Sequence, residues 1–126
     1  MPAQNITGEL IAAALIGDGA YTAYNNANAY LGVGNSSTAH AGAQTDLQGA
    51  SKTRKAMDAT YPSRSGDDVT FRSTFGTGDA NHAWEEWGVF NHASAGQMLI
   101  REVESLGTKT SSATWQLTVT LTFSAA

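Results

Sequence analysis

The sequence predicts an α+β fold: a mostly antiparallel β-sheet or sandwich with an N-terminal helix packed on it, in one domain over residues 1–126. Three observations support this prediction: an aromatic segment near residue 87, alternating runs on both sides of it, and helical apolar spacing near the N-terminus. A chain of 126 residues is near the usual size of one domain. The expected strands, forming one antiparallel unit, are 69–75, 84–90, 97–104 and 114–123.

The aromatic segment is expected to fill the centre of the core. Trp84, Trp87 and Phe90 lie within seven positions, and each such ring buries roughly 150–250 Å². Glu85 and Glu86 stand between the indoles, and neighbouring residues of a strand point to opposite faces. We therefore expect one exposed carboxylate and one inward carboxylate that is hydrogen-bonded to the backbone or to Arg101, because an unpaired buried charge is costly.

Two further runs alternate with the period of a half-buried strand. From residue 69 to 75 and from 115 to 123, apolar side chains occupy every second position, apart from Ser73. The final run places threonines on the opposite face, which is either solvated or a flat surface for a neighbouring subunit. The positions expected in the core are Phe71, Phe75, Trp84, Glu86, Trp87, Gly88, Phe90 and Trp115. Those proposed for an assembly interface are Tyr21, Tyr24, Thr118, Thr120 and Thr122.

The N-terminal segment predicts a short amphipathic helix. Asn5 or Thr7 is the expected N-cap. Ile6, Leu10 and Ala14 recur at four-residue spacing, and Ile11 and Leu15 lie beside them in the same stripe. Such a helix lays one apolar stripe on a sheet and stops at the glycines of residues 17–19.

The segment from residue 20 to residue 68 predicts loops and two minor strands. Residues 20–29 are rich in Asn and Ala, which suits a loop that clasps a surface. A short strand is expected at 29–34, and a charged edge strand at 52–58. Residues 38–50 predict a long connection or a short helical turn, and residues 61–68 predict a turn.

Composition excludes several classes of partner. Charged residues make up 14% of the chain, and the net charge is −4. Nucleic acid is not expected as a partner, because phosphate binding requires a basic patch. The sequence has no cysteine, no signal-peptide pattern and no apolar run of the roughly 20 residues that a membrane span needs. We therefore expect synthesis in a cytoplasm, and part of the surface covered by copies of the chain or by a larger body.

No catalytic, cofactor or metal pattern is found. Gly32 and Gly34 follow a predicted strand, but they lack the third glycine and the acidic residue of a dinucleotide site and the Lys-Ser/Thr of a phosphate loop. The three histidines, at positions 40, 82 and 92, lie in predicted loops without zinc-site spacing. His82 and His92 flank the aromatic segment, and an adventitious metal site would require them to meet across a hairpin. The expectation is therefore a protein that is not an enzyme.

Several short motifs carry a family resemblance. The segment Glu86-Trp-Gly-Val-Phe-Asn is followed by a glycine turn and Met98-Leu-Ile-Arg. Upstream are Leu31-Gly-Val-Gly-Asn and Thr45-Asp-Leu. Together they resemble the N-terminal module of bacteriophage tail-collar and tail-fibre proteins. Glu86, Gly88 and Phe90 correspond to structural positions of that module, and the resemblance supplies no active site.

The resemblance implies a non-enzymatic structural protein of a bacteriophage virion. The sequence ends at Ala126 without the shaft of a fibre, so the expected role is a minor tail protein at the tail tip or the fibre attachment. Its expected partners are copies of itself and other virion proteins. A capsid decoration protein is the alternative. A carbohydrate-binding module is the second alternative, because exposed indoles and Tyr24 can stack on sugars, and the burial of the indoles distinguishes it.

Overall fold

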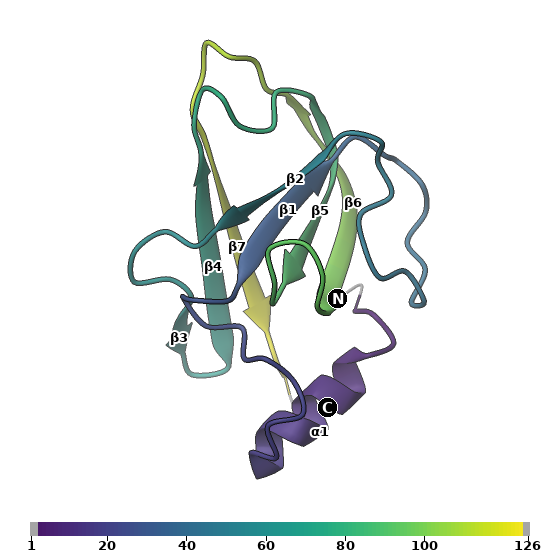
Figure 1. The fold of residues 1–126 in the computed structure, drawn as a ribbon, viewed down its shortest axis with the longest axis vertical. Helices are drawn as coiled ribbons and strands as arrows, with labels where there is room; N and C mark the ends of the chain where they lie inside the picture. Colours follow the sequence, from purple (N-terminus) through teal and green to yellow (C-terminus); the bar gives the residue numbers. More distant parts are fainter. Residues whose placement is uncertain (1–2, 125–126) are drawn as a thin grey trace.

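The structure is a computed structural model, and it describes residues 3–124. It contains one helix and two antiparallel sheets, which confirms the predicted α+β class (Figure 1). Sheet A has the strand order β2-β1-β5-β6, and sheet B has the order β3-β4-β7. The elements are α1 (Thr7–Ile16), β1 (Tyr30–Gly34), β2 (Lys52–Ala56), β3 (Ser63–Ser65), β4 (Asp68–Phe75), β5 (Ala83–Phe90), β6 (Met98–Thr108) and β7 (Trp115–Thr122).

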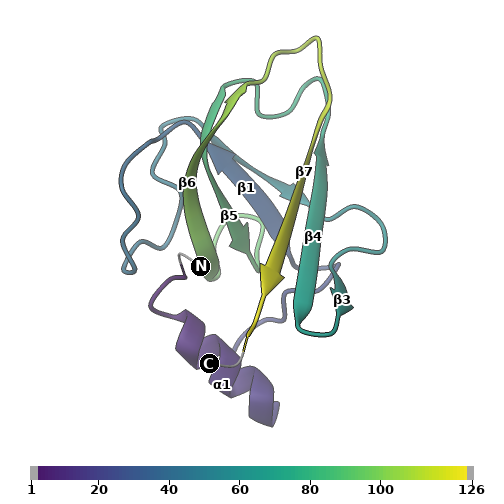
Figure 2. The same ribbon diagram turned by 180° about the vertical axis from the view of Figure 1, so that it is seen from behind.

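The four main strands do not form one continuous unit, which corrects the prediction. β5 pairs with β6 in sheet A, whereas β4 pairs with β7 in sheet B. The segments that follow β4 and β6 carry the chain from one sheet to the other (Figure 2). The alternation of apolar side chains places each strand's inner face, but it does not identify the neighbouring strand.

The two sheets face each other across the main core. This cluster joins inner residues of both sheets, among them Leu31 and Val89 from sheet A and Phe71, Val119 and Leu121 from sheet B. On one side of the sandwich, β1 and β2 lie against β4. On the other side, β6 and β7 are the outermost strands of their sheets, and they stand apart as separate edges (Figure 2).

Only the N-terminal part of α1 packs on the sandwich. Leu10 joins the core, whereas Leu15 is 84% exposed, and α1 extends below the strands (Figure 1). The predicted cap is wrong: the N-cap position is Ile6, without a side-chain hydrogen bond. The Thr7 hydroxyl instead donates to the Leu99 carbonyl oxygen at 2.9 Å. That bond ties the first turn of α1 to β6, although it does not satisfy a helix N–H as a cap would.

The minor strands follow the prediction with one addition. β1 and the charged edge strand β2 are present and pair with each other. The turn expected at residues 61–68 contains the three-residue strand β3, which pairs with the beginning of β4. Gly66 has φ +61° at the tip of that hairpin, a conformation that glycine adopts without steric cost.

Candidate functional site

A buried ion pair lies in sheet A beneath the long connection that precedes β2. Arg101 on β6 donates from Nε to Oε1 of Glu86 on β5 at 2.8 Å, and both side chains are 0% exposed. This confirms the predicted pairing of the inward carboxylate with Arg101. Glu85, the neighbouring residue, accepts a hydrogen bond from Ser105 at the surface.

The same Glu86 carboxylate holds the connection of residues 35–51 on the sheet. It accepts backbone N–H bonds from Gln48 at 2.8 Å, Gly49 at 2.7 Å and Ser36 at 3.3 Å. A Cβ on Gly34 would collide with Oε2 of this carboxylate. The carboxylate therefore acts as a fixed anchor for both ends of the loop.

Arg101 extends the anchor to the middle of that connection. Its Nη1 donates to Oε1 of Gln44 at 3.1 Å, and Gln44 Oε1 also accepts the Ala41 backbone N–H at 3.0 Å. Within residues 3–124, Nη2 of Arg101 is buried and has no hydrogen-bond partner. Both charges face the protein interior, so the geometry gives the pair a structural role.

The glycines of β1 and β5 allow the connection to pack closely on the sheet. A Cβ on Gly32 would lie 2.8 Å from a ring carbon of Phe90 and 3.1 Å from Leu47. A Cβ on Gly88 would lie 3.0 Å from the Ile100 carbonyl oxygen. These glycines are therefore needed for close approach of neighbouring groups, which accounts for the glycine pair of β1 without a phosphate.

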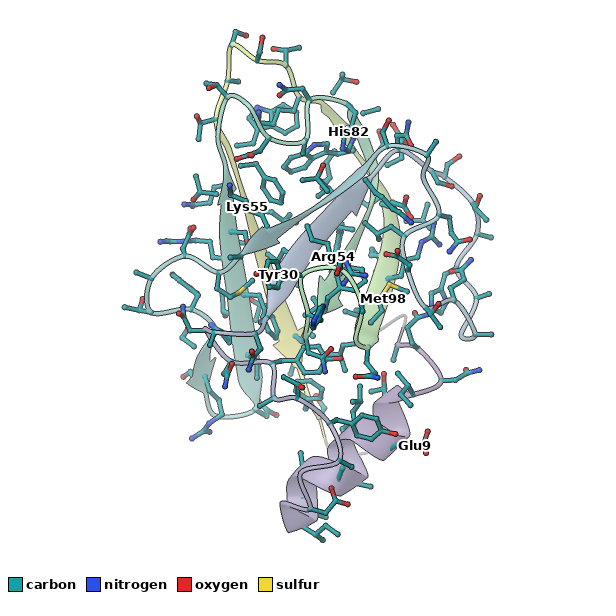
Figure 3. The ribbon with its side chains drawn as sticks, in the orientation of Figure 1. Glu9, Tyr30, Arg54, Lys55, His82 and Met98 are labelled. Carbon is teal, nitrogen blue, oxygen red and sulfur yellow. The ribbon has the colours of Figure 1, made fainter. Side chains whose placement is uncertain are left out.

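A second, charged cluster holds the connection at Asp46. Asp46 accepts from Lys52 at 2.9 Å and from Nη2 of Arg54 at 3.2 Å. The Arg54 guanidinium lies 3.6 Å from the centre of the Phe90 ring and donates to the carbonyl oxygens of residues 92 and 95. Figure 3 shows Arg54 over the middle of sheet A, near Tyr30. The cluster joins β2 to the β5–β6 loop.

Because Asp46 can be protonated, the contribution of this cluster to stability depends on pH. Partial burial raises the pKa of the Asp46 carboxyl, but hydrogen bonds from Lys52, the Leu47 backbone N–H and Arg54 outweigh it, so the pKa lies below 3.8. A lowered folded-state pKa contributes stability that is complete above the unfolded pKa and is lost as the pH falls through the folded pKa.

Substituting Asp46→Asn is therefore expected to flatten the acid limb of stability. The wild type should lose free energy of unfolding more steeply below pH 3.8 than the variant. Urea unfolding at a series of pH values from neutral to strongly acidic measures both curves. Parallel acid limbs for Asp46→Asn and the wild type would contradict the assignment.

The aromatic side chains fill the end of the sandwich between β4, β5 and β7. Trp84 is 2% exposed and meets Phe75 and Trp115 edge to face, with centroids 4.9 and 5.0 Å apart. Its Nε1 donates to the Ala80 carbonyl oxygen at 3.0 Å. Trp87 is half-buried, and its Nε1 donates to Glu104. The expected core positions therefore lie in the interior, except that Trp87 and Trp115 are half-buried.

The residues proposed for an assembly interface fall into two separate groups. Thr118, Thr120 and Thr122 are exposed on the outer face of sheet B. Tyr21 and Tyr24 instead pack against the core and line a cavity of about 410 Å³ beside α1. The threonines are exposed on sheet B, whereas the tyrosines are partly buried beside α1, so the five residues do not form one exposed surface.

Tyr24 is further fixed by a hydrogen bond. Its hydroxyl donates to the Gln97 carbonyl oxygen at 2.8 Å, and burial raises the pKa of this phenol. Tyr24 therefore fastens the loop before β1 to the segment that leads into β6. This agrees with the prediction that residues 20–29 form a loop clasping a surface.

The apolar outer face of α1 was not predicted. Ile11, Leu15 and Ile16 are exposed by 50%, 84% and 74%. The sequence prediction assigned Ile11 and Leu15 to the stripe that faces the sheet. The helix has a single charged residue, Glu9, so it is apolar on nearly all sides, and that composition is the signal for a second, outward contact.

The histidines do not meet. His40 Nε2 lies 2.7 Å from Gln4 Oε1, and His82 Nδ1 lies 2.8 Å from the Ala83 carbonyl oxygen. His92 Nδ1 accepts two backbone N–H bonds within its own loop. His82 and His92 flank opposite ends of β5, with His82 far from α1 (Figure 3). Residues 3–124 contain no group of three or more His, Cys, Asp or Glu side chains arranged to hold a metal.

Comparisons with known proteins give no family assignment. No known protein family, no curated protein and no solved structure matches the chain. Within the described part of the chain, no helix is both long enough and apolar enough to cross a membrane.

Proposed function

We propose that this chain is a non-enzymatic structural component of a bacteriophage virion, a minor tail protein that docks on other virion proteins at the tail tip or the fibre attachment. The observation that carries the proposal is the mutual contact of the motifs that resemble the tail-collar module. They come from four segments: 31–35, 45–47, 86–91 and 98–101. Three of these segments include parts of β1, β5 and β6, which are neighbouring strands of sheet A, and the fourth packs on them through Leu47.

The contacts among these motifs are specific. Gly34 lies against the Glu86 carboxylate, which pairs with Arg101. Leu47 packs with Phe90 and Met98 in one small buried cluster. The motifs thus interlock around one buried anchor in sheet A, as expected for a module whose short motifs maintain a scaffold.

The surface supports docking on other proteins. The outer face of α1 presents Ile11, Leu15 and Ile16 to solvent, and contiguous exposed apolar side chains commonly mark protein contacts. Only 14% of the residues are charged, and depletion of charge is typical of the centre of an interface. Both features favour a building block of a larger assembly.

The carbohydrate-binding alternative receives no support from the aromatic geometry. Sugar stacking requires exposed ring faces, whereas Trp84 is 2% exposed. The Trp84 and Trp115 rings are inclined at 77°, so they do not form a flat platform. Tyr24 is held against the loop before β6 by its hydroxyl.

Immunogold labelling of virions tests the proposal. An antibody raised against this purified chain is applied to intact particles from the host culture that produces it, with an antibody to an unrelated cytoplasmic protein as the control. Gold at the tail end is the expected result. Gold over the head shell would replace the tail assignment with capsid decoration, and particles without label, together with absence of the chain from their denatured protein, would overturn the virion proposal.

A further inference from the structure

Strand β7 is a sheet edge without the usual protection against pairing with another chain. Natural edge strands carry charges, are very short or are irregular, because an exposed ladder of backbone groups recruits other strands. β2 carries Lys52, Arg54 and Lys55, and β3 is three residues long. β6 carries Glu102 and Glu104, and its pairing with β5 is irregular. β7 is eight residues long, regular and uncharged.

The hydrogen-bond phase of β7 shows which of its backbone groups point away from β4, toward the side where residues 3–124 supply no strand. The Phe123 backbone N–H donates to the Asp67 carbonyl oxygen at 2.9 Å. Because hydrogen-bonded and non-bonded pairs alternate in an antiparallel ladder, the odd-numbered residues of β7 direct their backbone groups toward β4. The even-numbered residues therefore direct theirs to the open side: Gln116, Thr118, Thr120 and Thr122.

We propose that β7 pairs antiparallel with β7 of a second copy of this chain, with the two-fold axis at Val119. In this register the backbone of Thr118 bonds that of Thr120 in the second copy, and Gln116 is opposite Thr122. Val119 then meets its own counterpart as a non-hydrogen-bonded pair. This register pairs even-numbered residues with even-numbered residues, as the outward-facing backbone groups of β7 require. The two B sheets become one continuous sheet of six strands.

A second copy fits this edge because β7 is complementary to itself. Pairing about Val119 keeps apolar side chains opposite apolar ones, with Leu117 across from Leu121, and threonines opposite threonines. Cross-strand pairs of these kinds are favourable. The same symmetric pairing of β6 would bring Glu102 and Glu104 near their own copies, and like charges across a ladder are unfavourable. A closed two-fold contact also leaves no unpaired β7 edge.

The dimer is independent of the virion assignment. It concerns only the β7 edge, whereas the proposed docking on other virion proteins is supported by sheet A and the outer face of α1. Failure of either proposal therefore leaves the other in place. The dimer joins two threonine faces into one continuous outer surface of the six-stranded sheet.

Sedimentation velocity on the purified chain, from micromolar concentration to about 1 mM, tests the dimer. The wild type should show a reversible monomer–dimer equilibrium. Thr118→Lys should weaken the dimer by at least about tenfold, because the two new ammonium groups lie diagonally across the ladder. The matched control Thr118→Val should dimerise like the wild type, since it keeps the β-branched shape without a charge.

Folding of the variants is checked separately, so that a lost dimer is not mistaken for a lost fold. Far-UV circular dichroism and thermal unfolding should match the wild type for Thr118→Lys, because its side chain is exposed. The added lysine also reduces the net charge from −4, so weaker association cannot come from overall repulsion. A wild-type chain that remains monomeric throughout, or a dimer that Thr118→Lys leaves intact, overturns the proposal.

Single-cysteine variants test the register. The chain contains no cysteine, so Val119→Cys forms a disulfide under mild oxidation only with a second copy. In the proposed register the two Cα atoms at position 119 lie about 4.5 Å apart, whereas those of the Gln116→Cys variant are separated by about 20 Å along the strands. Rapid crosslinking at position 119 and not at 116 is expected. Equal crosslinking at both positions overturns this pairing.

Discussion

Replacing Glu86 with alanine is expected to lower the free energy of unfolding by about 3–5 kcal/mol. Arg101, 0% exposed, would keep its charge without a counterion, and removing one partner of a buried pair carries that cost. Small domains have a total stability of about 5–15 kcal/mol, so the variant should be near the limit of folding. Urea unfolding followed by circular dichroism measures the loss.

Two further variants separate the charge of Glu86 from its role as a hydrogen-bond acceptor. Glu86→Gln keeps one acceptor oxygen near the loop and should lose less stability than Glu86→Ala. The double variant Glu86→Leu with Arg101→Met removes both charges, a change that is often tolerated in other proteins. Here it should remain strongly destabilising, because the backbone N–H groups of Ser36, Gln48 and Gly49 still lose their acceptor.

The loop itself provides the readout specific to this anchor. Native-state hydrogen exchange should show faster exchange at the Gln48 and Gly49 amides in any variant without the carboxylate. The β4–β7 ladder belongs to the other sheet and should keep its protection in the variants that fold. A Glu86→Ala chain that loses less than about 1 kcal/mol, with unchanged exchange at these amides, would contradict the anchor.

The main strands could be predicted from the sequence because apolar and polar side chains alternate along them. A half-buried strand must place apolar side chains on one face, and β4 and β7 show this pattern directly. Strand pairing could not be predicted in the same way. Every strand with an apolar inner face satisfies the rule equally, so pairing depends on the segments of residues 76–82 and 109–114, which carry no periodicity.

The anchor of sheet A was partly predictable. Two adjacent carboxylates between indoles require one inward side chain, and Arg101 is a suitable partner for it. The three backbone N–H groups could not be predicted, because residues 35–51 have no regular pattern and their path is set by contacts with the sheet. Lys109, 1% exposed, was missed for a similar reason: its partners are the Gly76 carbonyl oxygen and the Asn81 side chain in a loop.

The outward face of α1 shows where periodicity misleads. A helix with apolar residues at positions 10, 11, 15 and 16 has two possible inner faces, and the prediction assigned both to the sheet. The structure buries only the side of Leu10. The Thr7 hydroxyl ties the first turn of α1 to β6, whereas Ile11, Leu15 and Ile16, further along the helix, are exposed.

Replacing Trp84 with alanine is expected to cost about 3–5 kcal/mol of unfolding free energy. The indole is 2% exposed, and its removal leaves a cavity between Phe75 and Trp115. Both edge-to-face contacts are lost, and each contributes about 0.5–1.5 kcal/mol beyond the buried area. Thermal and urea unfolding measure the loss.

Trp87→Ala, in the same strand, is the matched control for the burial of the indoles. Trp87 is half-buried, and the carboxylate that accepts its Nε1 hydrogen is exposed, so the variant should lose less than half as much stability as Trp84→Ala. The stability loss of Trp84→Phe should lie between the losses of Trp84→Ala and Trp87→Ala. Phenylalanine restores part of the indole volume but not the N–H donor to the Ala80 carbonyl oxygen. If Trp84→Ala were as stable as Trp87→Ala, the interior placement of Trp84 would be wrong, and the sugar-stacking interpretation of the indoles would regain its basis.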